Sequence, residues 1–179
     1  GGATMIQLRE KNISEDEYVA LAKEIKEVTD KYNIPLIIND QVDVALACDA
    51  AGVHVGQQDM AAALARVKIG QEKILGVSVQ TVEQAILAEK AGADYLGVGS
   101  VFPTSTKKDA ALVSKETLKA ICDSVNIPVV AIGGINEENI TQLNGSDIAG
   151  ISVVSAIFAQ KDAQKAAEGL RIQVEKILG

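Results

Sequence analysis

The sequence predicts an α/β protein in which a parallel sheet alternates with helices, and three observations support this prediction. Short apolar runs alternate strictly with segments of helical periodicity along the 179-residue chain. Hydrophobic residues make up 47% of the chain and aromatic residues only 3%, which suits a core of small aliphatic side chains between helices. Nearly every apolar run also ends in polar or glycine-rich residues.

The first expected strand lies in the segment 4–11, an apolar run that becomes polar through Gln7, Arg9 and Lys11. In a strand these three side chains would share one face, because successive residues point to opposite sides. Such a face suits an anionic ligand. Solvated charges on an edge strand explain this segment equally well when it is taken alone.

The remaining elements follow in order. A capping box of Ser14 and Glu17 begins a helix that runs to about Tyr32. Further helices are expected at 42–50, 61–69, 81–92 and 163–178, after Ser114 and, as a short piece, after Asn136. Further strands are expected at 36–38, 53–55, 74–79, 95–102, 128–132 and 150–155. The pattern predicts seven βα units in a single domain over residues 1–179.

Polar residues at nearly every strand end favour a (β/α)8 TIM barrel. In an open doubly wound sheet they should instead gather at one switch point. A barrel of this class closes with eight strands, whereas the chain shows seven units and begins in what resembles a loop leading into a strand. We therefore expect that the first β/α unit is missing from this chain and would lie before Gly1.

Composition and charge argue against several classes of function. The net charge is −7 and the only basic cluster is Lys107-Lys108, so we expect no nucleic-acid partner. We also expect no membrane partner, because no apolar run is long enough to span a bilayer and no signal peptide opens the chain. Cys48 and Cys122 lack metal-type spacing and are expected to be reduced. These features predict a cytoplasmic protein that acts on small phosphorylated molecules, and they leave a homo-oligomer open.

Two carboxylates, Asp40 and Asp59, end successive expected strands. Neighbouring parallel strands lie about 4.8 Å apart, so carboxylates at equivalent strand ends can share a cation. Mg²⁺ usually takes one or two protein carboxylates and completes its shell with water and phosphate. Either residue alone would more often cap the following helix. Together, beside a basic strand, they favour a magnesium site.

Other candidates lie at later strand ends. Gly133-Gly134 and Val154-Ser155 follow the last two strands, where barrels frequently hold a phosphate on backbone amides. The loop 104–107 offers hydroxyl groups and one ammonium for a second phosphate-bearing group, although a simple turn explains it equally well. The only histidine, His54, is expected to be buried or to support a site residue rather than to act as a base.

Seven motifs along essentially the whole chain resemble the thiamine phosphate synthase family. They are QLREK at 7–11, IND at 38–40, GQQD at 56–59, GVS at 76–78, TSTK at 104–107, AIGGI at 131–135 and VSAIF at 154–158. The resemblance implies a (β/α)8 barrel that joins hydroxymethylpyrimidine diphosphate to hydroxyethylthiazole phosphate. The implied reaction is dissociative and Mg²⁺-assisted, and it forms thiamine phosphate and diphosphate.

The resemblance also implies roles for individual residues. The substrate-binding positions would be Gln7, Leu8, Arg9, Glu10, Lys11, Asn39, Ser78, Thr104, Ser105, Thr106, Lys107, Gly134, Val154 and Ser155. Among them Arg9, Lys11, Ser78 and Lys107 would be catalytic, and they would hold the pyrimidine diphosphate together with Gln7 and Asn39. Thr104, Thr106, Gly134, Val154 and Ser155 would hold the thiazole phosphate, and Asp40 and Asp59 would hold Mg²⁺.

Two alternatives remain. A thiazole tautomerase of the same fold, an isomerase that works without magnesium, is similar to this family. It carries a histidine where this chain has Gln80, and it lacks a carboxylate matching Asp59. The second alternative is a non-catalytic barrel that binds a phosphorylated ligand, against which Lys11, Asp40, Asp59 and Lys107 all argue. One departure from the family pattern is Gln58, which replaces an acidic residue beside the metal carboxylate.

Overall fold

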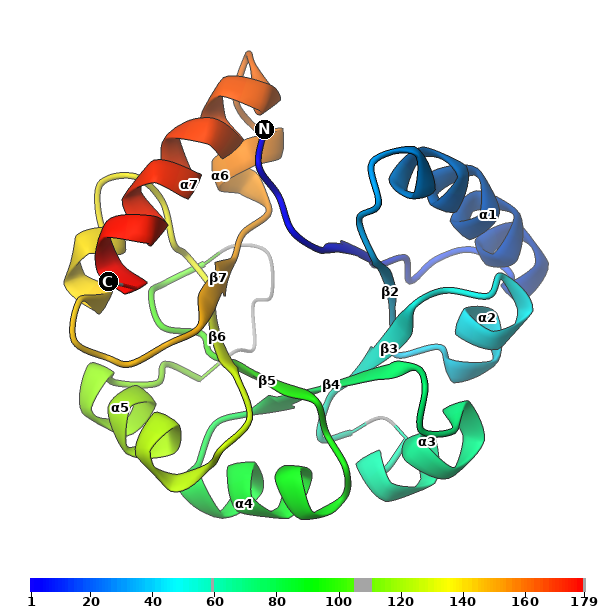
Figure 1. Ribbon diagram of the computed structural model, residues 1–179, viewed down its shortest axis with the longest axis horizontal. Coiled ribbons are helices and arrows are strands. Elements are labelled where there is room, and N and C mark those ends of the chain that lie inside the picture. Colours follow the sequence, from blue (N-terminus) through cyan, green and yellow to red (C-terminus); the bar gives the residue numbers. More distant parts are fainter. Residues whose placement is uncertain (59, 105–110, 179) are drawn as a thin grey trace. The chain divides into compact units, whose positions relative to one another are not determined.

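The computed structural model describes residues 1–58, 60–104 and 111–178, and the chain divides into two compact units. The N-terminal unit contains Ala3–Ser78 and Lys90–Asp94. The C-terminal unit contains Gly1–Gly2, Val79–Glu89 and the chain from Tyr95 onward. Helices and strands alternate along both units, as the coloured ribbon of Figure 1 shows. The single domain stays a prediction.

Four parallel strands pair in chain order in the N-terminal unit. They are β1 (Ile6–Leu8), β2 (Leu36–Asn39), β3 (Gly52–Val55) and β4 (Ile74–Val79), of which only Val79 belongs to the other unit. The connecting helices are α1 (Glu15–Lys31), α2 (Val42–Ala47) and α3 (Ala62–Ile69). Every residue of β2 and β3 is buried, as expected for short apolar strands covered by helices.

The C-terminal unit repeats this arrangement with three parallel strands. They are β5 (Tyr95–Val98), β6 (Val129–Ile132) and β7 (Gly150–Ser152), paired in chain order. The helices are α4 (Val82–Lys90), α5 (Lys115–Ser124), the 3₁₀ helix η1 (Ile140–Leu143), α6 (Ser155–Phe158) and α7 (Ala163–Leu178). The described residues thus confirm the predicted alternation of strands and helices, and their strands are parallel.

Helix starts follow the predicted capping residues. Ser14 accepts a hydrogen bond from the backbone N–H of Glu17 at 3.3 Å, and the Glu17 carboxylate accepts one from the backbone N–H of Ser14 at 2.9 Å. This hydrogen bond from Ser14 lowers the pKa of Glu17. Ser114 caps α5 by accepting from the backbone N–H of Thr117. These caps form because donor and acceptor are close in sequence.

Two predicted strands are shorter than expected. The strand expected at 95–102 ends at Val98, and the peptide bond between Gly99 and Ser100 is cis. The strand expected at 150–155 ends at Ser152, because Ser155 already begins the short helix α6. Apolar composition continues past both ends, so it does not mark where backbone pairing stops.

Two helices also differ from prediction. The helix expected at 42–50 ends at Ala47, because Asp49 adopts a left-handed conformation with φ of 51°. Asn136 accepts hydrogen bonds from the backbone N–H groups of Glu138 and Asn139, but the 3₁₀ helix begins only at Ile140, with Asn139 at its N-cap. Asn136 therefore shapes the turn that precedes the helix instead of capping it.

Buried Arg66 ties the loop after α4 to the N-terminal unit. Its guanidinium donates to Gly92 O at 2.8 and 3.0 Å, to Gly70 O at 2.6 Å and to Lys73 O at 2.7 Å. It also pairs with the Asp94 carboxylate at 2.5 Å. These contacts explain why Lys90–Asp94 cluster with the N-terminal unit although they follow most of α4.

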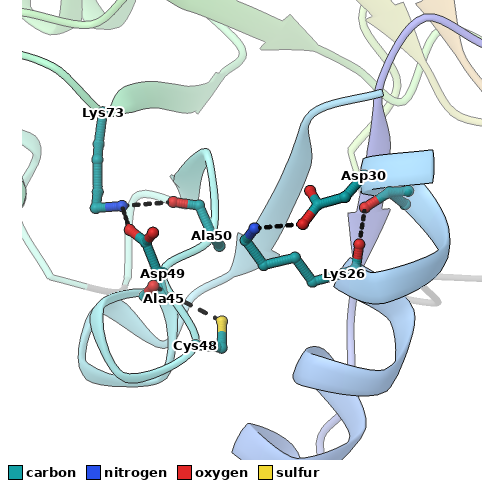
Figure 2. Close-up of polar contacts among 8 residues, drawn as sticks. Lys26, Asp30, Ala45, Cys48, Asp49, Ala50 and Lys73 are labelled. Atoms are coloured by element: carbon teal, nitrogen blue, oxygen red, sulfur yellow. Dashed lines mark hydrogen bonds and ion pairs between the residues drawn. The ribbon is translucent and has the colours of Figure 1, made fainter. Parts of the chain in front are cut away.

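Ion pairs connect neighbouring segments of the chain that precede the strands (Figure 2). Lys73, just before β4, donates to Asp49 at 2.6 Å and to Ala50 O at 2.7 Å, just before β3. The hydrogen bond from Lys73 lowers the pKa of Asp49. Lys26 and Asp30 pair along α1 at 2.7 Å. These pairs lie at the N-terminal ends of the strands or on a helix, away from the strand ends that carry the predicted site.

Candidate functional site

Most of the first predicted motif, residues 7–11, lies after the end of β1. Gln7 is the central, exposed residue of β1, whereas Arg9 and Lys11 come after the strand has ended at Leu8. The prediction that Gln7, Arg9 and Lys11 share one strand face is therefore wrong. A strand of this length fixes only one polar side chain, and the two cations are exposed on the segment that leads to α1.

A buried tyrosine of α1 holds the segment that carries these cations. The Tyr18 hydroxyl donates to Leu8 O at 2.8 Å and accepts from the backbone N–H of Glu10 at 3.4 Å. The side chain is only 3% exposed, and burial raises the pKa of its phenol. The hydroxyl bridges the residues before and after Arg9, so it constrains the backbone from which Arg9 and Lys11 project.

An open cavity of about 430 Å³ adjoins this segment. Its lining combines charged, amide, phenolic and aliphatic side chains, from Glu10, Lys11, Ile13, Glu15, Tyr18, Asp40, Gln41 and Val44. The cavity thus brings together Lys11 and Asp40, which were predicted to contact the diphosphate and the metal. Another hollow of about 400 Å³ is lined by Asp30, Asn33, Ile34 and Pro35 before β2, and none of these residues belongs to the predicted site.

Asp40 occupies a constrained position directly after β2. Its φ is 63°, in the left-handed region that an aspartate tolerates better than most residues. Its backbone N–H donates to His54 O at 2.8 Å, which ties the end of β2 to β3. The N-cap of α2 is Gln41, so Asp40 does not take the helix-capping position that the sequence left open. Left-handed backbone at the exit of a buried strand is a feature of functional sites.

The described side chains suit magnesium if the ion takes only a few of its ligands from the protein. Within the described ranges, no group of three or more His, Cys, Asp or Glu side chains could hold a metal ion by itself. The half-buried carboxylate of Asp40 lines a cavity that also contains Lys11, a cation suited to phosphate. This set suits an ion that takes few protein ligands and obtains the rest from water and a bound phosphate. Asp59, the second predicted ligand, lies outside the described residues.

Ser78 is held by two residues from β3 and the segment after it. Its hydroxyl lies 2.8 Å from Nε2 of His54, and its carbonyl oxygen accepts from Nε2 of Gln57 at 2.8 Å. His54 is 7% exposed, which agrees with the prediction of a buried or supporting residue. In the strand register His54 lies opposite Gly76, and Asn39 of β2 lies opposite His54. Asn39, His54 and Ser78 thus occupy consecutive strands.

The glycine pair after β6 packs closely against its neighbours. Gly133 and Gly134 have φ of 99° and 67°. A Cβ atom on Gly134 would collide with backbone oxygens of Phe102 and Pro103, and Asn139 Nδ2 donates to Gly134 O at 2.9 Å. Glycine is therefore needed here for the turn itself. A phosphate-binding role at Gly134 remains a prediction.

The other predicted positions of the C-terminal unit lie at its strand ends. Val154 and Ser155 are exposed and form the N-cap and first residue of α6, directly after β7. Thr104 is half-buried and follows the segment that packs on Gly134. Ser105, Thr106 and Lys107 lie outside the described residues, so their predicted roles stay predictions.

Sequence reasoning missed two contributors. Tyr18 was not singled out within the expected helix, and Gln57 was included only as part of the motif at 56–59. The missing information is spatial, because nothing local in the sequence shows that a hydroxyl on α1 reaches the end of β1. The alternation of side chains along β3 and β4 was visible, but the register that brings His54 to Ser78 was not.

Comparison with known proteins shows which family this chain resembles. The family model described as thiamine monophosphate synthase matches residues 1–157. The thiamine-phosphate synthase of Clostridium tetani is 58% identical over 170 residues, covering 95% of this chain and 81% of the relative. Thiamine-phosphate synthase 2 of Streptococcus pneumoniae serotype 4 is 50% identical over 177 residues, covering 99% of this chain and 84% of the relative.

A solved structure agrees over the whole chain. Thiamine phosphate pyrophosphorylase from Pyrococcus furiosus matches with a TM-score of 0.92 and 46% identity, covering 100% of this chain and 86% of the other. This match confirms the predicted fold class, a TIM-barrel-like arrangement of parallel strands and helices. No helix within the described part of the chain is long and apolar enough to cross a membrane. The chain therefore belongs to the thiamine monophosphate synthase family of transferases.

Proposed function

We propose that the protein joins hydroxymethylpyrimidine diphosphate to hydroxyethylthiazole phosphate, forming thiamine phosphate and diphosphate in the cytoplasm. The observation that carries this proposal is the cavity shared by Lys11 and Asp40 beside the end of β1, in a chain 58% identical to a thiamine-phosphate synthase. A cation and a carboxylate in one cavity suit a diphosphate that arrives with a divalent metal.

The proposed chemistry needs a stabilised leaving group more than it needs a base. The bond between the pyrimidine methylene carbon and the diphosphate oxygen breaks, and both electrons leave with diphosphate. The nitrogen lone pair of the thiazole then forms the new C–N bond to the methylene carbon. Fixed positive charge near the departing oxygens lowers this barrier, because it is already in place when the negative charge develops.

The N-terminal unit would supply this charge. Arg9 and Lys11 would bind the diphosphate oxygens, since both project from the segment held by Tyr18. Gln7, Asn39 and Ser78 would bind the pyrimidine diphosphate through an amide or hydroxyl group. Leu8 and Glu10 would contribute through the backbone that the Tyr18 hydroxyl fixes. Lys107 is proposed to add a further cation.

Mg²⁺ is the proposed metal, with Asp40 and Asp59 as its protein ligands. When bound, it would supply additional positive charge to the diphosphate. The support in this structure is the placement of the half-buried Asp40 carboxylate beside Lys11 in one cavity. An ion that relies on phosphate for part of its shell suits such a site.

The C-terminal unit would hold the thiazole phosphate. Gly134, Val154 and Ser155 follow β6 and β7, where phosphate groups commonly bind backbone amides in folds of this class. Thr104, Ser105 and Thr106 would add hydroxyl donors. We assign these residues to substrate binding only. The residues that we propose for the chemical step are those proposed to bind the diphosphate.

Paired carboxylate variants test the metal assignment. Asp59→Ala should abolish Mg²⁺-dependent formation of thiamine phosphate while the far-ultraviolet circular dichroism spectrum and unfolding midpoint remain those of wild type. Asp43→Ala is the matched control, because Asp43 is an exposed carboxylate of α2 paired with Lys68. It should keep full activity. Wild-type turnover by Asp59→Ala, with an unchanged dependence on Mg²⁺, would remove Asp59 from the metal site.

A further inference from the structure

Buried His54 contacts Ser78, one of the residues proposed to bind the pyrimidine diphosphate. The proposed chemistry relies on a stabilised leaving group more than on a general base, and the imidazole of His54 lies with Nε2 at 2.8 Å from the Ser78 hydroxyl. The side chain is 7% exposed, so it contacts solvent little and cannot readily exchange this partner for water. Either group can be the donor in this hydrogen bond, and the tautomer of the imidazole decides which way the hydroxyl proton points.

The register of β3 and β4 makes this contact specific. His54 pairs with Gly76, and Ser78 lies two residues further along the same strand face. Gly76 contributes no side chain at this position of the register, and the imidazole contacts Ser78. Gln57 holds the carbonyl oxygen of Ser78 at 2.8 Å, so both the backbone and the hydroxyl of this serine are constrained.

We propose that His54 is a positioning residue, whose Nε2–H donates to Ser78 Oγ and leaves the serine hydroxyl proton free for the pyrimidine diphosphate. A hydroxyl has one proton and two lone pairs. If the Ser78 hydroxyl instead donated its hydrogen bond to Nε2 of His54, Oγ would present only lone pairs to the anionic diphosphate. Donation from His54 prevents that orientation. The inference rests on the proposed function, since it assigns the direction of a hydrogen bond to that substrate.

The sole histidine of the chain makes the donor directly observable. In protein labelled with ¹⁵N, a spectrum at about pH 8, above the ordinary histidine pKa of about 6.5, should contain one imidazole, protonated at Nε2. The Nε2–H proton should exchange slowly with water in wild type and faster in Ser78→Ala. An imidazole protonated only at Nδ1, or an exchange rate unaffected by Ser78→Ala, would overturn the proposal.

Kinetics then show whether this hydrogen bond acts through Ser78. His54→Phe keeps an aromatic ring without the donor, and it should lower kcat/KM for the pyrimidine diphosphate by roughly three- to tenfold, as expected for one hydrogen bond. KM for the thiazole phosphate should not change. His54→Gln places an amide N–H near the same position and should recover part of the loss. Ser124→Ala, which removes a hydroxyl bonded to Ile121 O at 2.8 Å in α5, is the matched control and should keep wild-type kinetics.

A double-mutant cycle separates positioning from a general structural effect. In the Ser78→Ala background, His54→Phe should have no further effect on kcat/KM, because its target hydroxyl is already absent. Independent, multiplicative losses would overturn the proposal, as would the absence of any recovery in a folded His54→Gln variant. If wild type forms no thiamine phosphate, the proposed function fails, whereas the ¹⁵N spectrum still decides whether His54 donates to Ser78.

Discussion

Replacing Arg66 by methionine should destabilise the N-terminal unit strongly. Methionine approximates the aliphatic stem of arginine but removes the five hydrogen bonds given to Gly70, Lys73, Gly92 and Asp94. The arginine side chain is 8% exposed and that of Asp94 is 50% exposed, so water can partly replace the lost partner at the carboxylate. A single charged hydrogen bond contributes about 1.5–3 kcal/mol to the free energy of unfolding. The five contributions cannot simply be summed, because one guanidinium makes all of these bonds.

The cost should therefore resemble that of breaking a single buried ion pair, about 3–5 kcal/mol in the free energy of unfolding. Urea denaturation followed by far-ultraviolet circular dichroism measures it. Arg66→Lys keeps the charge but loses the planar fork, so it should recover only part of the loss. Arg171→Met, which removes one exposed i,i+4 pair with Glu175, is the control and should cost less than about 1 kcal/mol.

Hydrogen exchange localises the effect. The backbone N–H of Leu75 donates to the Asp94 carboxylate at 2.7 Å, and the carboxylate is oriented by Arg66. Exchange at Leu75 should accelerate in Arg66→Met more than exchange at Ile121 in α5. An unfolding free energy within about 1 kcal/mol of wild type, with normal protection at Leu75, would show that Arg66 does not anchor this loop.

Three further substitutions and one pH dependence follow from the same contacts. Gly134→Ala should reduce both stability and thiamine phosphate formation, because its Cβ would collide with Phe102 and Pro103; wild-type values in both assays would contradict this. Tyr18→Phe should raise KM for the pyrimidine diphosphate by severalfold, whereas Tyr32→Phe, at a largely exposed tyrosine, should not change it in the same assay. Ser14→Ala should cost about 1 kcal/mol in urea denaturation through loss of the capping box, and a value indistinguishable from zero would argue against its contribution. Burial, followed by the Asp123 and Asp147 carboxylates, raises the pKa of Cys122 to about 11, so its contribution to stability should fall as pH rises from 9 towards 11, with the unfolded thiol ionising first. Cys122→Ala should flatten this part of the stability profile, and an unchanged slope would exclude the thiol as its source.

Local signals in the sequence predicted elements more accurately than contacts. The capping box of Ser14 and Glu17 was predicted because both partners lie within one helical turn, and the structure confirms it. The apolar run 74–79 was predicted with the bounds that β4 has, because polar residues delimit it on both sides. The strand at 150–155 was too long, since Val153 and Val154 are as apolar as the strand they follow.

The site was predictable as a set of residues but not as an arrangement. The prediction that Arg9 and Lys11 lie on a strand was wrong because β1 ends at Leu8. The segment that carries them is held by Tyr18, which belongs to a different element, α1. The contact between His54 and Ser78 depends on strand register, which a shift of one residue would abolish. Motif similarity selected the right family, but it carried no information about which buried groups hold the motif residues in place.

Product analysis of the wild-type protein tests the central claim most directly. The protein, shown to be folded by circular dichroism, is incubated with hydroxymethylpyrimidine diphosphate, hydroxyethylthiazole phosphate and Mg²⁺. Thiamine phosphate and diphosphate are then quantified separately. Both products should form in equal amounts, and neither should form when one substrate or Mg²⁺ is omitted. Folded protein that yields no thiamine phosphate, or that releases diphosphate without forming the C–N bond, would contradict it.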